Sequence, residues 1–206
     1  MPARLRPTAA IASEAILVGD PGRALMLAQE LLQEPKMCNH ARGLWGYSGN
    51  TEFGRELTIQ STGMGGPSAS VVLADLAELG VRRVIRIGTC ASLGSLELGD
   101  LLVVAEANGK LPDTPLTKAL RAALPGARQG PIVSLDSLYR PERELPSTVA
   151  EAADMQTAAL LAGAEERDLA AAAVLVVTEK NDSGQLGDEE LEARVKVAGR
   201  AASAVL

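Results

Sequence analysis

The chain has 206 residues, and 47% of them are hydrophobic, which supplies enough apolar material for a buried core and excludes an intrinsically disordered chain. Its 26 acidic and 20 basic residues give a formal net charge of -6, and only 2% of the residues are aromatic. Nucleic-acid-binding proteins usually present a basic face or stacking aromatic side chains, so this composition argues against one. The length suits a single domain over residues 1–206.

The sequence predicts neither a membrane anchor nor a secretory signal. Charged residues, Gly or Pro interrupt every apolar run before it reaches the roughly 18 residues that a bilayer span needs. Residues 1–15 contain arginines but no apolar core. The two cysteines, Cys38 and Cys90, are far apart and lack metal-ligand spacing. We therefore expect a cytoplasmic protein with reduced thiols, no metal site, and no nucleic-acid or membrane partner.

Strand-like and helix-like patterns alternate along the chain. Continuous aliphatic runs predict strands buried on both faces, and leucine or alanine repeats at helical spacing predict helices. In chain order we expect strand 15–18, helix 23–32, strand 57–61, helix 68–79, strands 84–87 and 101–104, a weaker strand at 132–133, helix 150–162, strand 174–177 and helix 188–206. This alternation predicts an α/β fold with three α/β/α layers around a central mixed sheet.

Residues 109–130 form the least regular stretch. Pro112, Pro115 and Pro125 interrupt it, residues 116–123 are its one helix candidate, and it shows no strand pattern. We interpret this stretch as a surface excursion.

The first segment with chemical interest is 17–23, LVGDPGR, which predicts a strand, a tight turn and a helix start. Free backbone N–H groups and the positive end of the helix dipole suit such a turn to an anion, and Arg23 adds a guanidinium. The alternative is an ordinary strand-to-helix turn with a solvated arginine.

A second strand, glycine-rich loop and helix start follow at 61–70, STGMGGPSAS. The loop matches neither a Walker loop nor the GxGxxG dinucleotide fingerprint. Its three glycines indicate that a ligand approaches the backbone closely. The alternative is a flexible turn in which Met64 fills core space.

The third segment is 84–92, VIRIGTCAS, in which Arg86 interrupts an apolar strand. An unpaired buried charge costs several kcal/mol, so Arg86 requires either a carboxylate partner or a bound anion, and the sequence leaves both open. Thr89 could donate its hydroxyl to the same anion. Cys90 is expected to pack rather than act as a nucleophile, because nothing places the single histidine, His40, beside it.

These three segments bring Arg23, Arg86 and Thr89 to the carboxyl ends of predicted strands, the edge at which α/β sheets bind ligands. Six motifs then resemble the nucleoside phosphorylase family in order and context: GDPGRA (19–24), NHARGLWGYSG (39–49), STGMGGPSAS (61–70), RIGTCASL (86–93), DMQTAALLA (154–162) and VVTEKND (176–182). That family holds hexameric purine nucleoside phosphorylases, uridine phosphorylases and related nucleosidases. The resemblance implies phosphorolysis of a nucleoside to a free base and ribose 1-phosphate, with inorganic phosphate as co-substrate and no cofactor.

The resemblance assigns the phosphate end of the site to five positions. They are Gly19, Arg23, Arg86 and Thr89, together with Arg42, which reaches the phosphate of a neighbouring subunit in relatives. A hydrolytic nucleosidase does not need such a cluster, so its retention favours phosphorolysis. The arginines would orient phosphate and stabilise charge while the glycosidic bond breaks.

The ribose end departs from the family pattern. Relatives read VEMEA or VDMEA, with the second carboxylate holding ribose hydroxyls, whereas this chain has Asp154, Met155 and Gln156. The resemblance assigns Met64, Met155 and Gln156 to ribose. A neutral amide at position 156 loses the charge-assisted hydrogen bond.

The resemblance makes Glu179 the candidate acid that protonates the leaving base, with Asp182 as the fallback. It assigns the base pocket to Cys90, Ala91, Val133, Asp154, Thr178 and Glu179. Residues 133–139 resemble the base-pocket strand, and Arg140 and Arg143 follow without the glutamine that reads uracil, so purine is slightly favoured. An N-terminal histidine that relatives lend to the adjacent site is missing from residues 1–8.

If Arg42 serves a neighbouring site, at least a dimer is required, and the resemblance implies a hexamer built from such dimers. His40, Trp45 and Tyr47 are expected at turns, in packing or at subunit contacts. Two alternatives to phosphorolysis remain: a hydrolytic nucleosidase, and a catalytically impaired protein that binds nucleoside or phosphate.

Overall fold

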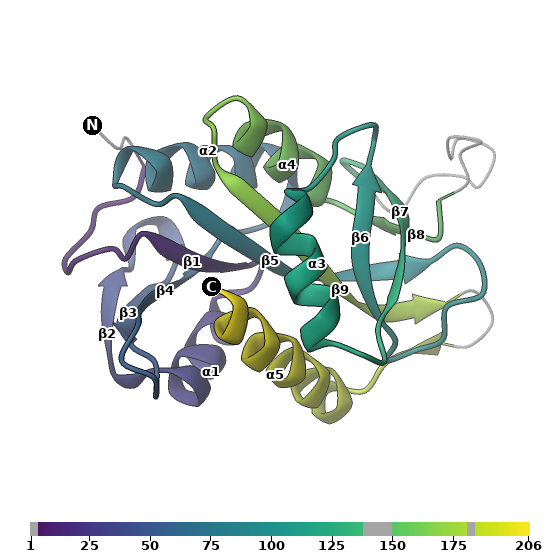
Figure 1. Cartoon of the computed structure of the whole chain (residues 1–206), viewed down its shortest axis with the longest axis horizontal. Coiled ribbons are helices and arrows are strands. Elements are labelled where there is room, and N and C mark those ends of the chain that lie inside the picture. Colours follow the sequence, from purple (N-terminus) through teal and green to yellow (C-terminus); the bar gives the residue numbers. More distant parts are fainter. Residues whose placement is uncertain (1–3, 138–149, 181–183) are drawn as a thin grey trace.

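The computed structural model describes residues 4–137, 150–180 and 184–206, and Figure 1 shows how the helices and strands within them are arranged. The helices are α1 (Pro21–Leu31), α2 (Gly65–Glu78), α3 (Thr114–Ala123), α4 (Thr157–Glu165) and α5 (Asp188–Val205). The strands are β1 (Glu14–Val18), β2 (Gln33–Asn39), β3 (Gly46–Asn50), β4 (Glu56–Ser61), β5 (Arg83–Ser92), β6 (Leu101–Ala107), β7 (Arg128–Ser134), β8 (Ala152–Asp154), β9 (Ala170–Lys180) and β10 (Gly184–Gln185).

The strands form one mixed sheet in the order β10-β9-β6-β7-β8-β5-β1-β4-β3-β2. Strand β9 also pairs with β5, so β5, β9, β6, β7 and β8 close into a ring. The two long strands make this possible: the first half of β5 pairs with β1, and its end reaches β8. One half of the sheet is therefore open, and the other half curls into a small barrel.

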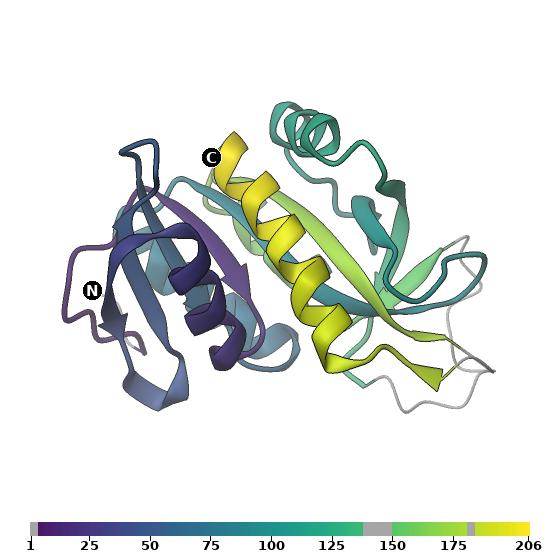
Figure 2. The same ribbon diagram turned by 90° about the horizontal axis from the view of Figure 1, so that it is seen from below.

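Helices cover both faces of the sheet, which confirms the predicted α/β/α layers. In Figure 1, α2 and α4 lie above the sheet and α1 and α5 lie below it. Figure 2 shows α5 lying along β9. One buried cluster joins α2 and α4 to the sheet through residues such as Leu73 and Leu161, and a second joins α1, α3 and α5 through residues such as Leu27 and Leu120. Sequestering these aliphatic side chains from water supplies the main drive to fold.

Strand register decides which loops meet. Strand β1 runs parallel to both β4 and β5, with Val18 opposite Ser61 and Ile87. The turn after β1, the loop after β4 and the second half of β5 therefore lie together at the carboxyl edge of the sheet.

Three sequence-based predictions differ from the structure. Residues 33–50 hold the edge strand β2 and its neighbour β3, which the sequence analysis missed because their polar and glycine-rich composition lacks an aliphatic run. The predicted helix 150–162 is wrong at its start, since Ala152–Asp154 form β8 and the helix begins at Thr157. Alanine suits helices, but pairing with β5 and β7 overrides that preference.

Residues 109–130 are not a surface excursion. The candidate helix is present as α3, and its Leu116 and Leu120 are buried against the sheet. The strand expected at 132–133 begins already at Arg128, because it pairs with β6. Within the described residues, no helix is both long and apolar enough to cross a bilayer.

Candidate functional site

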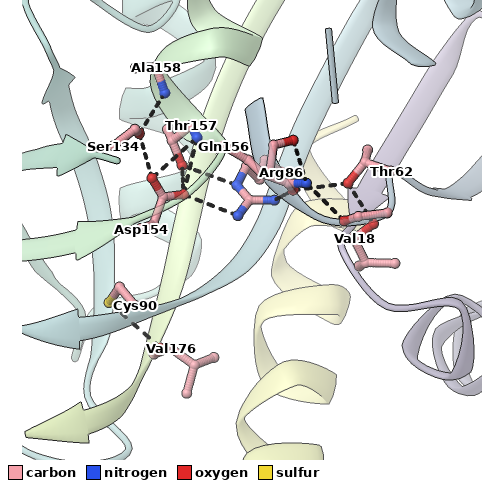
Figure 3. Close-up of polar contacts among 12 residues, drawn as sticks. Val18, Thr62, Arg86, Cys90, Ser134, Asp154, Gln156, Thr157, Ala158 and Val176 are labelled. Atoms are coloured by element: carbon pink, nitrogen blue, oxygen red, sulfur yellow. Dashed lines mark hydrogen bonds and ion pairs between the residues drawn. The ribbon is translucent and has the colours of Figure 1, made fainter. Parts of the chain in front are cut away.

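Arg86 lies on β5 with its side chain only 7% exposed, so its charge must be balanced by the protein or by a ligand. The guanidinium donates to three side chains of the turn between β8 and α4 (Figure 3). Nη2 lies 3.1 Å from Asp154 Oδ2, Nη1 lies 2.7 Å from Gln156 Oε1, and Nε lies 3.0 Å from Thr157 Oγ1. The carboxylate partner that the sequence left open is therefore Asp154. Two of the five N–H bonds of Arg86 have no partner in the described part of the chain.

Asp154 is held as firmly as Arg86. Its carboxylate is fully buried and accepts hydrogen bonds from the Thr157 hydroxyl, the Thr157 backbone N–H and the Ser134 hydroxyl. The Ser134 hydroxyl in turn accepts from the backbone N–H of Ala158. Because every oxygen of this carboxylate is occupied, Asp154 holds Arg86 in one position.

Gln156 joins this cluster to the glycine-rich loop. Oε1 accepts from Arg86 and lies 3.0 Å from the Thr62 hydroxyl, whose proton is also within reach of the Val18 carbonyl. Nε2 donates to the carbonyl oxygens of Gly63 and Gly65 at 2.8 and 3.2 Å.

The loop after β4 depends on glycine for its shape. Gly63 and Gly65 have φ angles of 72° and 81°, a region that side chains disfavour. A Cβ at Gly63 would also lie 2.7 Å from Ser68 Oγ, and a Cβ at Gly19 would lie 3.4 Å from the Gly63 carbonyl. The turn after β1 and this loop therefore touch beside Gln156.

Arg23 lies in the first turn of α1, after Asp20 caps the helix by accepting from the Arg23 backbone N–H. Burial lowers the pKa of the Arg23 guanidinium, Asp20 opposes that shift, and repulsion from Arg86 adds to it. Arg23 and Arg86 are therefore close enough to repel each other, an arrangement that an anion between them would stabilise. That the two motifs share one ligand site stays a prediction of the sequence.

Arg42 differs from the other two arginines. It is exposed, its φ of 61° lies in the left-handed region, and no described residue gives its side chain a hydrogen bond or an ion pair. Two buried hydrogen bonds fix the turn that carries Arg42: the side-chain amides of Asn39 and Gln60 both donate to the Leu44 carbonyl. A strained residue on a well-held turn is typical of functional positions.

The residues expected at the base end lie on neighbouring strands. Ala91 on β5 is opposite Ala153 on β8 and Glu179 on β9, and Val133 on β7 is opposite Ala153. The Thr178 hydroxyl donates to the Cys90 carbonyl at 3.4 Å. Glu179 is exposed, and its carboxylate has no partner among the described residues.

Cys90 is buried, and burial raises the pKa of its thiol to about 12. At neutral pH this thiol stays protonated, which agrees with a packing role rather than nucleophilic catalysis.

The remaining predicted residues have less contact with the cluster. Thr89 is half-buried, and its hydroxyl has no partner among the described residues. Met64 is 82% exposed at the start of α2, and Met155 is half-buried between Asp154 and Gln156. Tyr139, Arg140, Arg143, Asp182 and residues 1–3 lie outside the described residues.

Sequence reasoning did not identify Thr62, Ser134 and Thr157 as part of the site. Thr157 follows Gln156 directly, and Ser134 lies in the segment that resembles the base-pocket strand, so both were near motifs that had been singled out. Their hydroxyls gave no pattern of their own, because a Ser or Thr in a loop is common and its partners are distant in sequence.

The fold and the cluster together define an α/β protein with a buried, hydrogen-bonded arginine near the carboxyl edge of its sheet. The chain belongs to the phosphorylase superfamily, whose family model matches residues 14–206. It is 31% identical over 205 residues to a DeoD-type purine nucleoside phosphorylase of Caldanaerobacter subterraneus subsp. tengcongensis, covering 87% of this chain and 88% of that protein. It is 29% identical over 206 residues to a DeoD-type purine nucleoside phosphorylase of Alkaliphilus metalliredigens, with the same coverage.

The crystal structure of uridine phosphorylase from Vibrio fischeri ES114 has a similar fold. It superposes with a TM-score of 0.85 at 22% identity, covering 95% of this chain and 92% of that one. These findings confirm the family and the fold that the motifs predicted.

Proposed function

We propose that this protein is a nucleoside phosphorylase, a pentosyltransferase that uses inorganic phosphate to release a free base and ribose 1-phosphate. The observation that supports it best is the placement of Arg86. Its guanidinium is immobilised by Asp154, Gln156 and Thr157, yet two of its N–H bonds have no partner among the described residues, and Arg23 is close enough to be repelled by it. Such a preorganised cation can orient phosphate and stabilise developing charge without reorganising during the reaction.

The phosphate would lie between Gly19, Arg23, Arg86 and Thr89, with the unpartnered Thr89 hydroxyl as a further donor. Met64 and Met155 would pack against the ribose. The base would lie near the ends of β5, β7 and β9, with Glu179 protonating it as it leaves. No cofactor takes part in this scheme.

We favour a purine base over uracil. Both full-length relatives named above are purine nucleoside phosphorylases, whereas the uridine phosphorylase matches in fold at lower identity.

We further propose that the working enzyme is an oligomer, and a hexamer in particular, in which Arg42 completes the phosphate site of a neighbouring subunit. Arg42 is exposed and strained, and it has no partner in the part of the chain that the structure describes, which supports this role. A cytoplasmic location stays a prediction of the sequence.

The deciding experiment measures base release from inosine, adenosine, guanosine and uridine with and without phosphate. We expect turnover that depends on phosphate, fastest with a purine nucleoside. Turnover that persists after exhaustive phosphate removal would identify a hydrolytic nucleosidase. Thermal stabilisation by ligands without any base release would identify a binding protein instead.

A further inference from the structure

Gln156 occupies the position at which a carboxylate that holds ribose is expected, but the protein itself engages its amide on every side. An amide oxygen has two acceptor positions and an amide nitrogen has two protons. Here Arg86 and Thr62 face the oxygen, and the carbonyls of Gly63 and Gly65 accept from the nitrogen. The residue is 3% exposed and both polar atoms of its amide have partners in the protein, so a sugar hydroxyl has little access to either.

We infer that Gln156 is a positioning residue that fastens the Gly63–Gly65 loop to Arg86 and does not hold the sugar. The consequences for turnover rest on the proposed phosphorylase function, whereas the fastening of the loop does not.

The neighbours of Gln156 require an amide. Arg86 can only donate, so an oxygen must face it, and the carbonyls of Gly63 and Gly65 can only accept, so an N–H group must face them. A glutamate would place a carboxylate oxygen against two carbonyl oxygens with no proton between them. Glutamine satisfies both sides at once.

The neutral amide also suits a phosphate site. Asp154 already balances the charge of Arg86 at 3.1 Å. A second carboxylate on the same guanidinium would lower the positive potential that attracts a phosphate dianion. Because Gln156 is neutral, position 156 adds no negative charge that would offset the positive charge of Arg23.

The fastened loop borders the phosphate turn. A Cβ at Gly19 would lie 3.8 Å from Gln156 Oε1 and 3.4 Å from the Gly63 carbonyl. Movement of the loop away from Arg86 would therefore change the backbone beside the proposed phosphate position.

The first test is hydrogen exchange on Gln156→Glu. We expect backbone amides of residues 62–68 to exchange about tenfold faster than in the wild type, because two loop hydrogen bonds are lost. Gln129→Glu is the matched control, since Gln129 is exposed and accepts from Arg121, and its exchange at 62–68 should not change. Unchanged exchange in Gln156→Glu would overturn the inference.

The second test compares inosine with 2′-deoxyinosine. If Gln156 does not touch the sugar, Gln156→Met, which introduces no carboxylate, lowers kcat/KM for both nucleosides by the same factor, within about threefold, and raises the KM for phosphate by about tenfold. A change in kcat/KM that is more than threefold different between the two nucleosides contradicts the inference, because it shows contact with the 2′-hydroxyl.

Two further measurements separate this inference from the proposed function. Calorimetry with ribose 1-phosphate and 2-deoxyribose 1-phosphate gives the same comparison without turnover, and the ratio of their affinities should not change in Gln156→Met. If the wild type releases no base, the proposed function fails, while hydrogen exchange still decides whether the loop is fastened. Gln156→Met, which is uncharged and of similar length, replaces the glutamate variant if that variant does not fold.

Discussion

Arg86 and Arg42 belong to the same predicted phosphate set, yet their surroundings are opposite. Arg86 is buried in a strand and donates to Asp154, Gln156 and Thr157. Arg42 is exposed in a strained turn and has no partner among the described residues. Arg86 therefore finds its partners within its own chain, whereas Arg42 acquires a role only if a second molecule approaches it.

Removing the carboxylate from the buried arginine should have the largest effect. Asp154→Ala leaves Arg86 as an uncompensated buried charge, and we expect a loss of about 3–5 kcal/mol in the free energy of unfolding. Urea denaturation followed by circular dichroism measures it. A loss below about 1 kcal/mol would mean that water reaches Arg86 and that this arginine is not buried in solution.

Arg23 tests whether the cations gather for a ligand rather than for stability. Because burial and Arg86 both lower its pKa, Arg23→Ala should leave the free energy of unfolding unchanged or slightly raised. The KM for phosphate should rise about 10- to 100-fold, as expected when a charged hydrogen-bond donor is lost. Initial rates at varied phosphate measure this, and an unchanged KM would remove Arg23 from the site.

The titration of Cys90 reports whether water reaches the buried region around Arg86. Its folded pKa of about 12 lies above the ordinary value of 9.0, so the folded protein holds this proton more tightly than the unfolded chain does. Stability from this group is complete below pH 9 and is lost as the pH rises toward 12, by about 1.4 kcal/mol at pH 10. Urea denaturation of the wild type and Cys90→Ala at pH 8 to 10.5 should diverge above pH 9; parallel curves would show that the thiol is hydrated.

Arg42 should change stability far less than Asp154 does. Arg42→Gly removes the left-handed strain and should stabilise the fold by about 1 kcal/mol, whereas Arg42→Ala keeps the strain and should not. Both variants should raise the KM for phosphate if the residue serves a neighbour. Full activity of either variant, or a fully active monomer in analytical ultracentrifugation, would contradict the shared site.

Local pattern carried most of the fold prediction. The aliphatic runs at 15–18, 84–87 and 174–177 lie in β1, β5 and β9, because strands covered on both faces need apolar residues on both. The edge strand β2, its neighbour β3 and the short β8 were missed, since their conformation comes from pairing with neighbours rather than from their own composition. The closing of β5 and β9 into a ring had no local signal either.

The sequence by itself placed Arg23 just after one predicted strand and Arg86 near the end of another, because strand runs and turn motifs are local patterns. Only the tertiary structure decided that Arg86 pairs with Asp154 and that the amide of Gln156 is used up by the protein. Those partners lie 68 and 70 residues from Arg86 along the chain. Contacts at such separations depend on how the strands and helices pack, and no local pattern of residues encodes which oxygen will face a given guanidinium.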